Sequence, residues 1–312
     1  MVLNLGILVY KNKFEKYDSK NLGDYIQSIA QINFYRKLLN RYYDIELDIE
    51  NFIEKIFINN FKDFKFVFIA RDNLIDSANL YKDDNIYLIM SGWFLETPPE
   101  DTELQWPPPE NIIPIFVSFH IANEKLFNQK YISYFKKHQP IGCRDLTTKE
   151  RLKKNGVEAF FSGCLTLTLD CFDKEINKKD SSAYFVDVRI TIENFKEEKF
   201  NKKNKIYSIT HKMDFDKNDY YQIFSIALST LQKYSQAKYV YTSRLHAFVP
   251  CLAFNVPVSF TSPSAETGLK SWRSKNRFAG LTELKDNPSM INGIKDKLNS
   301  LLFDKFSKII DN

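Results

Sequence analysis

Residues suited to proton transfer and anion binding recur in one kind of place in this chain, directly after a short apolar run. In the densest block a β-rich stretch ends at Thr242-Ser243, and Arg244 and His246 follow at once. The two hydroxyls can cap a helix, which puts Arg244 and His246 in its first turn. Backbone N–H groups there favour an anion, guanidinium adds paired donors, and imidazole exchanges a proton near neutral pH. The alternative is a capped helix with Arg244 in solvent and His246 packed on a sheet.

Histidine occurs four times, and three of the four, His120, His211 and His246, follow short apolar runs, whereas His138 does not. A lone histidine is more often structural than catalytic, but three at equivalent positions favour one shared site. We therefore take His246 as the first candidate for proton transfer, followed by His120, with His211 as a further candidate.

The segment Asn21-Leu-Gly-Asp24 joins the first apolar run to the first amphipathic stretch. Gly23 permits a ligand to approach the backbone closely, and the side chains of Asn21 and Asp24 lie beside a helix N-terminus. The segment lacks the G-x-G-x-x-G pattern, so it does not indicate dinucleotide binding. A simple helix cap is an equally good interpretation.

Two later apolar runs are followed by Arg144-Asp145 and by Ser162-Gly163. The guanidinium of Arg144 makes it a second candidate for binding an anion. The alternative is a structural ion pair with Asp145, which can also cap the next turn. Ser162 and Gly163 are candidates by position alone.

Short apolar runs alternate with amphipathic stretches along the chain, which indicates strands alternating with helices. The predicted strands are 3–10, 64–70, 86–90, 112–119, 140–143, 183–188, 206–210, 239–242 and 256–261, with extended structure over 157–169. The predicted helices are 24–39, 123–137, 219–234, 245–253 and 290–310, and another runs from a capping box at 147–150 to a stop at 155–156. A polar, lysine-rich stretch at 173–180 interrupts this alternation. The pattern predicts two α/β domains, residues 1–172 and 181–312, each with a mostly parallel sheet.

Open parallel sheets bind ligands beyond the carboxyl ends of their strands. The candidates all follow predicted strands, so we expect a common cleft for Asn21, Gly23, Asp24, His120, Arg144, Arg244 and His246.

Composition narrows the classes of function. The 312 residues are 44% hydrophobic and 27% charged, as in ordinary globular proteins. The net charge of +5 comes from scattered residues, so we expect no nucleic-acid partner. No cysteines have C-x-x-C spacing and no carboxylates have metal-ligand spacing, so we expect no metal. Without a signal-peptide pattern or an apolar run of membrane-spanning length, we expect a cytoplasmic protein with no transmembrane segment.

The candidate segments also match a known set of motifs in order. They are Asn21-Leu-Gly-Asp24, Pro140-Ile-Gly-Cys-Arg-Asp-Leu-Thr-Thr148, Phe161-Ser-Gly-Cys-Leu-Thr-Leu-Thr168, Thr242-Ser-Arg-Leu-His-Ala247 with Pro257-Val258, and Arg277-Phe-Ala-Gly-Leu281. They resemble the N-x-G-D, R-D, S-G-C-x-T-L-T, S-R-L-H-A and R-F-x-G-L motifs of the polysaccharide pyruvyl transferase family. N-x-G-D alone is a weak signal, but the ordered set spans most of the chain and is fairly specific.

The resemblance implies two Rossmann-like domains in a GT-B-like arrangement facing a central cleft. It implies phosphoenolpyruvate as co-substrate, no cofactor, and a sugar acceptor on a glycan, a nucleotide or a lipid. By motif, Arg244 and His246 match the catalytic block and Arg144 the R-D arginine, with His120, Asn21, Gly23 and Asp24 as further donor-binding candidates. A downstream lysine of some members has no clear counterpart, because Lys270 and Lys275 compete for its place.

Two other functions remain open from the sequence. A GT-B-type glycosyltransferase using a nucleotide-sugar donor would have the same fold, and Ser264-Ala-Glu266 would be suited to the ribose or diphosphate. A catalytically dead relative that binds glycan is the third, although the intact Arg244 and His246 argue against it.

Overall fold

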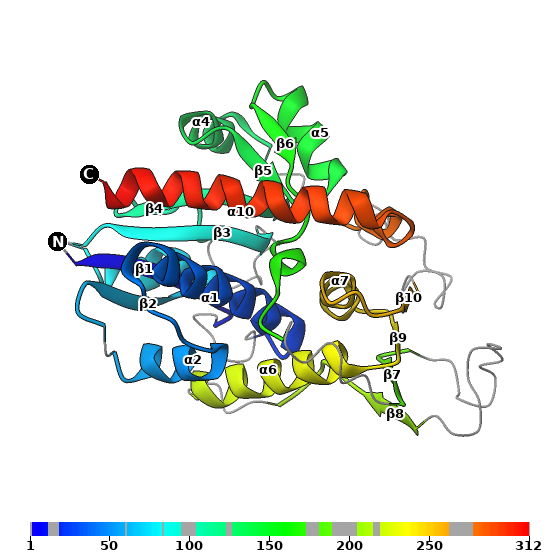
Figure 1. The fold of residues 1–312 in the computed structure, drawn as a ribbon. Coiled ribbons are helices and arrows are strands. Elements are labelled where there is room, and N and C mark those ends of the chain that lie inside the picture. Colours follow the sequence, from blue (N-terminus) through cyan, green and yellow to red (C-terminus); the bar gives the residue numbers. More distant parts are fainter. Residues whose placement is uncertain are drawn as a thin grey trace.

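Strands and helices alternate along the chain (Figure 1). The computed structural model describes residues 2–11, 19–59, 61–82, 84–94, 104–122, 127–172, 181–188, 205–214, 219–261 and 277–311. The strands are β1 (Leu3–Val9), β2 (Phe64–Ala70), β3 (Ile86–Phe94), β4 (Ile112–Ile121), β5 (Ile141–Cys143), β6 (Ala159–Phe161), β7 (Ser182–Val186), β8 (Lys205–Ile209), β9 (Tyr239–Thr242) and β10 (Val258–Phe260). The helices are α1 (Leu22–Tyr43), α2 (Ile49–Phe57), α3 (Leu74–Asn79), α4 (Gln129–Lys137), α5 (Leu146–Lys154), α6 (Tyr220–Gln236), α7 (Leu245–Ala253) and α10 (Pro288–Ile310), with short 3₁₀ helices η2 (Arg71–Asn73), η4 (Leu165–Thr168) and η7 (Thr282–Asp286).

The first sheet has the strand order β2-β1-β3-β4-β5-β6, and all its pairings are parallel. Strand β1 is buried along its whole length, as expected for a parallel strand covered on both faces. The strand order reverses at β1, which pairs with β2 on one side and β3 on the other. Such a reversal is where open α/β sheets bind their ligands.

The second sheet has the order β10-β9-β7-β8 and is also parallel in every pairing. Its first strand in the chain, β7, lies between β8 and β9, so the order reverses there as it does at β1. The α/β class and the parallel sheets predicted from the sequence are therefore confirmed, and the two sheets are separate in the described residues.

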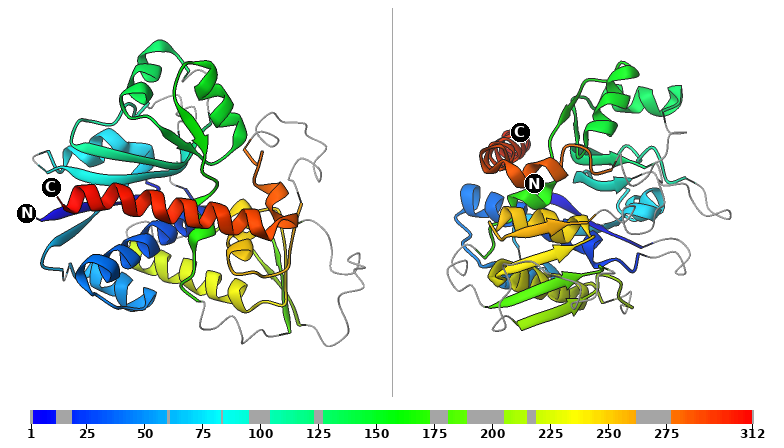
Figure 2. Two further views of the ribbon diagram at one scale, coloured as in Figure 1. Left: turned by 45° about the horizontal axis from the view of Figure 1, so that its top comes forward. Right: turned by 90° about the vertical axis from the view of Figure 1, so that its right-hand side faces the viewer.

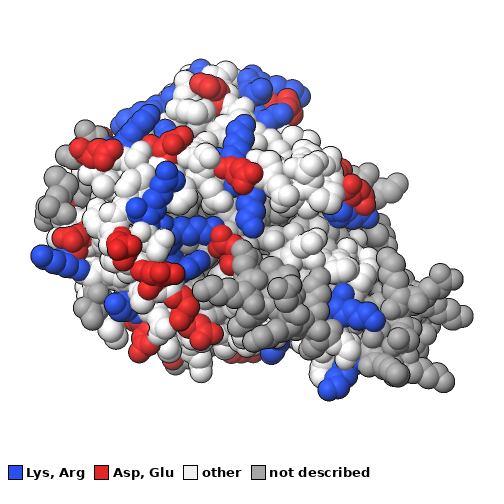
Figure 3. Space-filling model, viewed as in Figure 1, with Lys and Arg blue, Asp and Glu red and all other residues white. Residues whose placement is uncertain are grey.

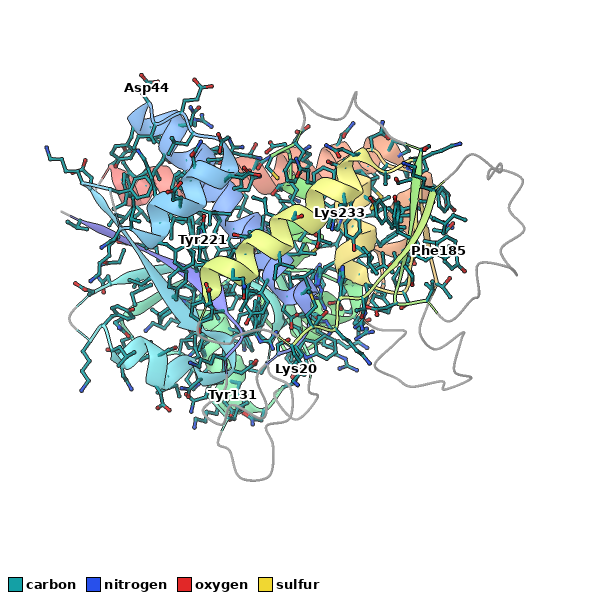
Figure 4. All side chains as sticks on the ribbon, turned by 90° about the horizontal axis from the view of Figure 1, so that it is seen from below. Lys20, Asp44, Tyr131, Phe185, Tyr221 and Lys233 are labelled. Atoms are coloured by element: carbon teal, nitrogen blue, oxygen red, sulfur yellow. The ribbon has the colours of Figure 1, made fainter. Side chains whose placement is uncertain are left out.

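Helices α1 and α6 join the two halves of the chain. Tyr25 of α1 packs edge-on against Phe224 of α6, with ring centroids 6.1 Å apart. Phe57 at the end of α2 contacts both Phe224 and Tyr221 of α6. Figure 4 shows α6 running from Tyr221, over the helices of the first half, to Lys233 near the second sheet. The hydrophobic core consequently continues from one half into the other.

Helix α10 returns from the second half to the first, as Figure 2 shows, and ends close to the N-terminus. Phe303 and Phe306 pack on Phe34 of α1, with centroids 5.3 and 5.5 Å apart. The C-terminal helix therefore packs on the first half of the chain. No helix in the described stretches combines the length and the apolar character needed to cross a membrane.

Most predicted elements are confirmed, and β2, β9 and α7 match to the residue. The capping box at 147–150 is wrong, because Asp145 caps α5 and its side chain accepts a hydrogen bond from the Thr148 N–H. The extended stretch 157–169 is wrong in part, because residues 165–168 form the 3₁₀ helix η4. Helices α2 and α3 were not predicted, and the predicted linker 173–180 lies outside the described residues.

Charges of both signs are interspersed on the face shown in Figure 3, where Lys and Arg alternate with Asp and Glu. The mixture matches the scattered basic residues in the sequence. Among the described residues on that face, Lys and Arg form no continuous basic surface of the kind that nucleic-acid binding needs.

Two glycines should respond to alanine in opposite directions. A Cβ on Gly142 of β5 would lie 2.7 Å from the Phe116 carbonyl oxygen, whereas one on Gly293 of α10 would meet nothing within 4 Å. We expect Gly142→Ala to lower the free energy of unfolding by about 1–3 kcal/mol through overpacking. Gly293→Ala should raise it by roughly 0.5–1 kcal/mol, because alanine favours a helix interior. Denaturant unfolding measures both changes, and a neutral Gly142→Ala would contradict the strand packing described here.

Candidate active site

The N-terminus of α1 meets the start of α7 at Gly23. A Cβ added to Gly23 would lie 3.2 Å from both Cβ and Nδ1 of His246. Asn21 caps α1 by accepting a hydrogen bond from the Gly23 N–H, and it also forms an isolated antiparallel bridge with Lys212. A loop of the first half is therefore held against a histidine of the second half.

Arg144 is the most unusual charge in this region. Its side chain follows β5, and the residue is only 1% exposed. The backbone N–H donates to the Phe119 carbonyl at 2.9 Å, but the guanidinium Nε has no hydrogen-bond partner among the described residues. Burial lowers the pKa of Arg144, while the charges of Asp145 and Asp24 oppose that shift. A buried guanidinium with an unused donor is suited to receive an anion.

His246 lies among positive groups. Its Nε2 atom is buried and has no hydrogen-bond partner among the described residues. Burial lowers the pKa of His246 well below its usual range, and the charges of Arg144, His211 and Arg277 lower it further. The imidazole is therefore neutral in the ligand-free protein, a state in which one ring nitrogen can accept a proton.

His120, at the end of β4, has a carboxylate partner. Its Nδ1 lies 2.5 Å from Oδ2 of Asp145, and its ring lies against Trp93 with centroids 4.6 Å apart. Burial lowers the pKa of His120, Asp145 raises it, and Arg144 and Arg277 lower it again, with a net downward shift. The same histidine, together with Arg144, holds the pKa of Asp145 below its ordinary value despite burial. Asp145 is therefore charged, and Nδ1 of His120 carries the hydrogen of their bond.

Asp24, in the first turn of α1, is a half-buried acid in the same group of charges. It accepts a hydrogen bond from the Ser19 hydroxyl at 2.6 Å. Burial raises the pKa of Asp24, and Arg71 opposes this shift most strongly. The charge of Asp24 also acts on Arg144, which places the two in one electrostatic group.

Arg244 binds a carboxylate of its own half. Its Nε donates to Asp187 Oδ2 at 2.6 Å, and its side chain is 27% exposed. Asp187 directly follows β7, has a φ of 51°, and also accepts hydrogen bonds from the Thr210 hydroxyl and the His211 N–H. Arg244 is itself the N-cap residue of α7, and no side chain makes a capping hydrogen bond there. The predicted cap by Thr242-Ser243 is therefore wrong. The Thr242 hydroxyl instead accepts from the Arg244 N–H at 2.9 Å.

His211 ties the halves together through its backbone. Its carbonyl accepts from the Leu22 N–H at 2.8 Å, and the neighbouring Met213 N–H donates to the Lys20 carbonyl. The His211 side chain is fully buried, with Nε2 2.7 Å from the Tyr234 hydroxyl. Burial lowers the pKa of His211 to about 4, helped by the charge of Arg244.

Ser162 and Gly163 lie beside this group and pack the sheet. The Ser162 hydroxyl accepts from the Ser118 N–H at 2.8 Å and donates to the Cys143 carbonyl at 3.0 Å. Gly163 has a φ of 70°, and a Cβ there would lie 2.9 Å from Ile294 of α10. Both residues thus support the strand end that carries Arg144. Lys270, Lys275 and Ser264-Ala-Glu266 lie outside the described residues.

The structure therefore links six of the predicted residues by contact or charge: Asn21, Gly23, Asp24, His120, Arg144 and His246. Arg244 joins them through His211, whose imidazole interacts with His246. Within the described stretches, no three His, Cys, Asp or Glu side chains gather as metal ligands.

Two arginines of the group were missed from the sequence. Arg71 directly follows β2, donates twice to Asp72, and lies 4.7 Å from the centroid of the Tyr10 ring. Arg277 lies over Trp93 and acts on both His120 and His246 through its charge. The strand-end rule would have found Arg71. The R-F-A-G-L segment contained Arg277, although it was used only as a motif match.

The described residues thus form an α/β fold with two parallel sheets, in which Arg144 and His246 belong to one group of buried, interacting charges. A family model described as polysaccharide pyruvyl transferase matches residues 21–264. The chain belongs to this family and is a transferase. No curated protein matches it in sequence.

The buried His211 should make stability depend on pH. Its folded-state pKa of about 4 lies below the ordinary 6.5, so the unfolded state binds more protons between these values. The stability contributed by neutral His211 is therefore complete above the ordinary pKa and is lost as the pH falls through about 4. The loss approaches about 3 kcal/mol.

Urea unfolding of the wild type and His211→Gln across this range measures the effect. The variant should show a pH slope smaller by about one proton, whereas His138→Gln, at a half-buried histidine, should keep most of the wild-type slope. Equal slopes in the wild type and His211→Gln would mean that His211 is not held neutral by the fold.

Proposed function

We propose that this chain transfers the pyruvyl group of phosphoenolpyruvate to two hydroxyls of a sugar, forming a cyclic ketal and releasing phosphate. The observation that carries the proposal is the buried guanidinium of Arg144, whose Nε has no partner within the described stretches. Phosphoenolpyruvate brings a carboxylate and a phosphate, and guanidinium matches both groups. Arg277 and Arg71 add positive charge in the same electrostatic group.

Arg244 is proposed to meet the donor from the second half. Asp187 holds its Nε, which fixes the plane of the guanidinium and leaves the remaining nitrogens for an anion. Its partial exposure distinguishes it from Arg144, which is buried. The two arginines would then bind the two anionic groups of one donor, in a cleft between domains 1–172 and 181–312 arranged as in GT-B folds.

His246 is proposed to take part in proton transfer. Ketal formation adds a proton to the enol carbon and removes protons from two sugar hydroxyls, so the site needs a group that gives and accepts protons. The His246 Nε2 has no other partner among the described residues, and its neighbours include Arg144. The acceptor is proposed to be a sugar diol carried on a glycan, a nucleotide or a lipid. All four cysteines are free, which supports a cytoplasmic location.

A ligand screen tests the donor. Phosphoenolpyruvate should raise the melting temperature of the protein, because it binds the folded state only. Nucleoside diphosphates are the comparison, since stabilisation by these alone would favour a glycosyltransferase. Mass spectrometry of sugar acceptors incubated with phosphoenolpyruvate and protein should then show the pyruvyl mass increment.

Removing the Arg144 guanidinium should abolish most of the donor affinity. We expect Arg144→Met to weaken phosphoenolpyruvate binding by roughly 30-fold or more, as for other buried charge pairs that lose one partner. Lys154→Met removes the same charge from the exposed end of α5 and should leave binding unchanged. Calorimetric titration measures both, with melting curves as a check on folding. Unchanged affinity in a folded Arg144→Met protein would remove Arg144 from the donor site.

His246→Gln should separate binding from turnover. Glutamine keeps a polar side chain beside Gly23 but cannot carry a proton, so kcat should fall by about 10²–10⁴-fold while donor affinity changes little. Arg244→Lys should instead raise the KM for phosphoenolpyruvate, because lysine lacks the paired donors. Steady-state kinetics with an acceptor that the wild type converts measures both. Near-normal turnover in folded His246→Gln would exclude His246 from proton transfer.

A further inference from the structure

His120 and His246 differ in the charged groups that surround their rings. His120 has the carboxylate of Asp145 on its Nδ1 at 2.5 Å, and the Thr148 hydroxyl lies 3.2 Å from the same nitrogen. Among the described residues, the charged neighbours of His246 are Arg144, His211 and Arg277, and none of them is a carboxylate. A carboxylate on one ring nitrogen orients an imidazole and stabilises its protonated form. Positive neighbours do the opposite.

We propose that His120, oriented by Asp145, is the acid that protonates the enol carbon of phosphoenolpyruvate, and that His246 is the base that takes the proton of the attacking sugar hydroxyl. The inference rests on the proposed function and divides its proton transfers between two residues. His120 becomes a catalytic residue, and Asp145 a positioning residue that acts through it.

The contacts of His120 leave its Nε2 atom for the substrate. All the hydrogen bonds that His120 makes to the described residues use Nδ1. Trp93 covers one face of the ring. Asp145 is itself fixed, because its Oδ1 caps α5 through the Thr148 N–H at 2.8 Å. Rotation of the imidazole is therefore restricted, and Nε2 is the atom that remains to give a proton.

The negative charge of the bound donor favours protonation of His120. In the free protein burial opposes a positive charge on His120 most strongly, Arg144 and Arg277 oppose it as well, and Asp145 favours it, with a net lowering of the His120 pKa. A bound carboxylate and phosphate neutralise the arginines, so the balance moves toward the imidazolium. The acid is thus charged when the anionic donor is present. Proton uptake on donor binding is a direct consequence.

The proton balance closes over the reaction. Nε2–H of His120 goes to C3 of the donor as the C2=C3 bond becomes single, and the first sugar oxygen bonds to C2 while its proton goes to His246. The second hydroxyl oxygen then bonds to C2, and the C2–O bond to phosphate breaks. His246 returns its proton to the leaving phosphate, and the proton of the second hydroxyl recharges His120. The products are the ketal and phosphate, and both histidines end as they began.

Two substitutions remove the proposed acid while sparing the fold. His120→Gln removes the ionisable imidazole. Asp145→Asn removes the negative charge beside that imidazole but keeps an oxygen to cap α5. Asp48→Asn is the matched control, because Asp48 caps α2 by the same kind of bond to the Asn51 N–H and has no histidine partner in the described residues. Melting curves of the variants check that each one folds, and His120→Gln remains a test even if Asp145→Asn does not fold.

Calorimetric titration with phosphoenolpyruvate in two buffers of different ionisation enthalpy counts the protons taken up on binding. We expect uptake by the wild type and Asp48→Asn, and its reduction in His120→Gln and Asp145→Asn. Any proton taken up by the donor's own phosphate is common to all four proteins. With an acceptor that the wild type converts, kcat of both site variants should fall by about 10²-fold or more.

The outcomes separate this inference from the proposed function. If the wild type does not bind phosphoenolpyruvate, the proposed donor is wrong, and the proposed proton transfer from His120 fails with it. If the wild type binds it but the number of protons taken up is the same in His120→Gln, the assignment of His120 is overturned. Normal turnover in folded His120→Gln would overturn it as well, while leaving pyruvyl transfer intact.

Discussion

The buried guanidinium of Arg144 is the constraint on which the rest of this site depends. A charge removed from water costs free energy unless it is paired, and the Nε of Arg144, at the end of β5, has no hydrogen-bond partner in the part of the chain that the structure describes. The fold opposes this cost only in part, through the nearby charges of Asp145 and Asp24. An anion from solution would complete the pairing. In the proposed function, this unfinished pairing is what the anionic donor completes.

The same constraint explains why segments distant in sequence are tied so closely. Arg144 and His120 come from the first sheet, whereas His246 comes from the second half and touches Gly23 at the start of α1. Hydrogen bonds from the backbone around Leu22 to His211 fix this junction, and α6 and α10 pack across it. A site made from both halves needs such ties, because small displacements between catalytic groups are costly to the reaction rate.

Much of the fold could be predicted from the sequence because its strands are apolar runs with clear ends. Strand β9 and helix α7 matched to the residue, and the strand-end rule selected most of the candidate residues that lie in contact or interact through their charges. The capping box at 147–150 was wrong because Thr147 and Glu150 offer a capping pattern two residues after Asp145, whose capping of the next turn had been only the alternative interpretation. The Arg244–Asp187 pair joins residues 57 positions apart, so no local pattern could show it. Nor could spacing show that His120, and not His246, has a carboxylate behind it.

The most direct test is a crystal structure of the protein with phosphoenolpyruvate bound. The account predicts that Nε of Arg144 donates to an oxygen of the donor's carboxylate or phosphate, with the donor lying between His120 and His246. Its enol carbon should face Nε2 of His120. A donor bound elsewhere, with the Arg144 Nε satisfied by the protein itself, would contradict the claim that this buried cation organises the site.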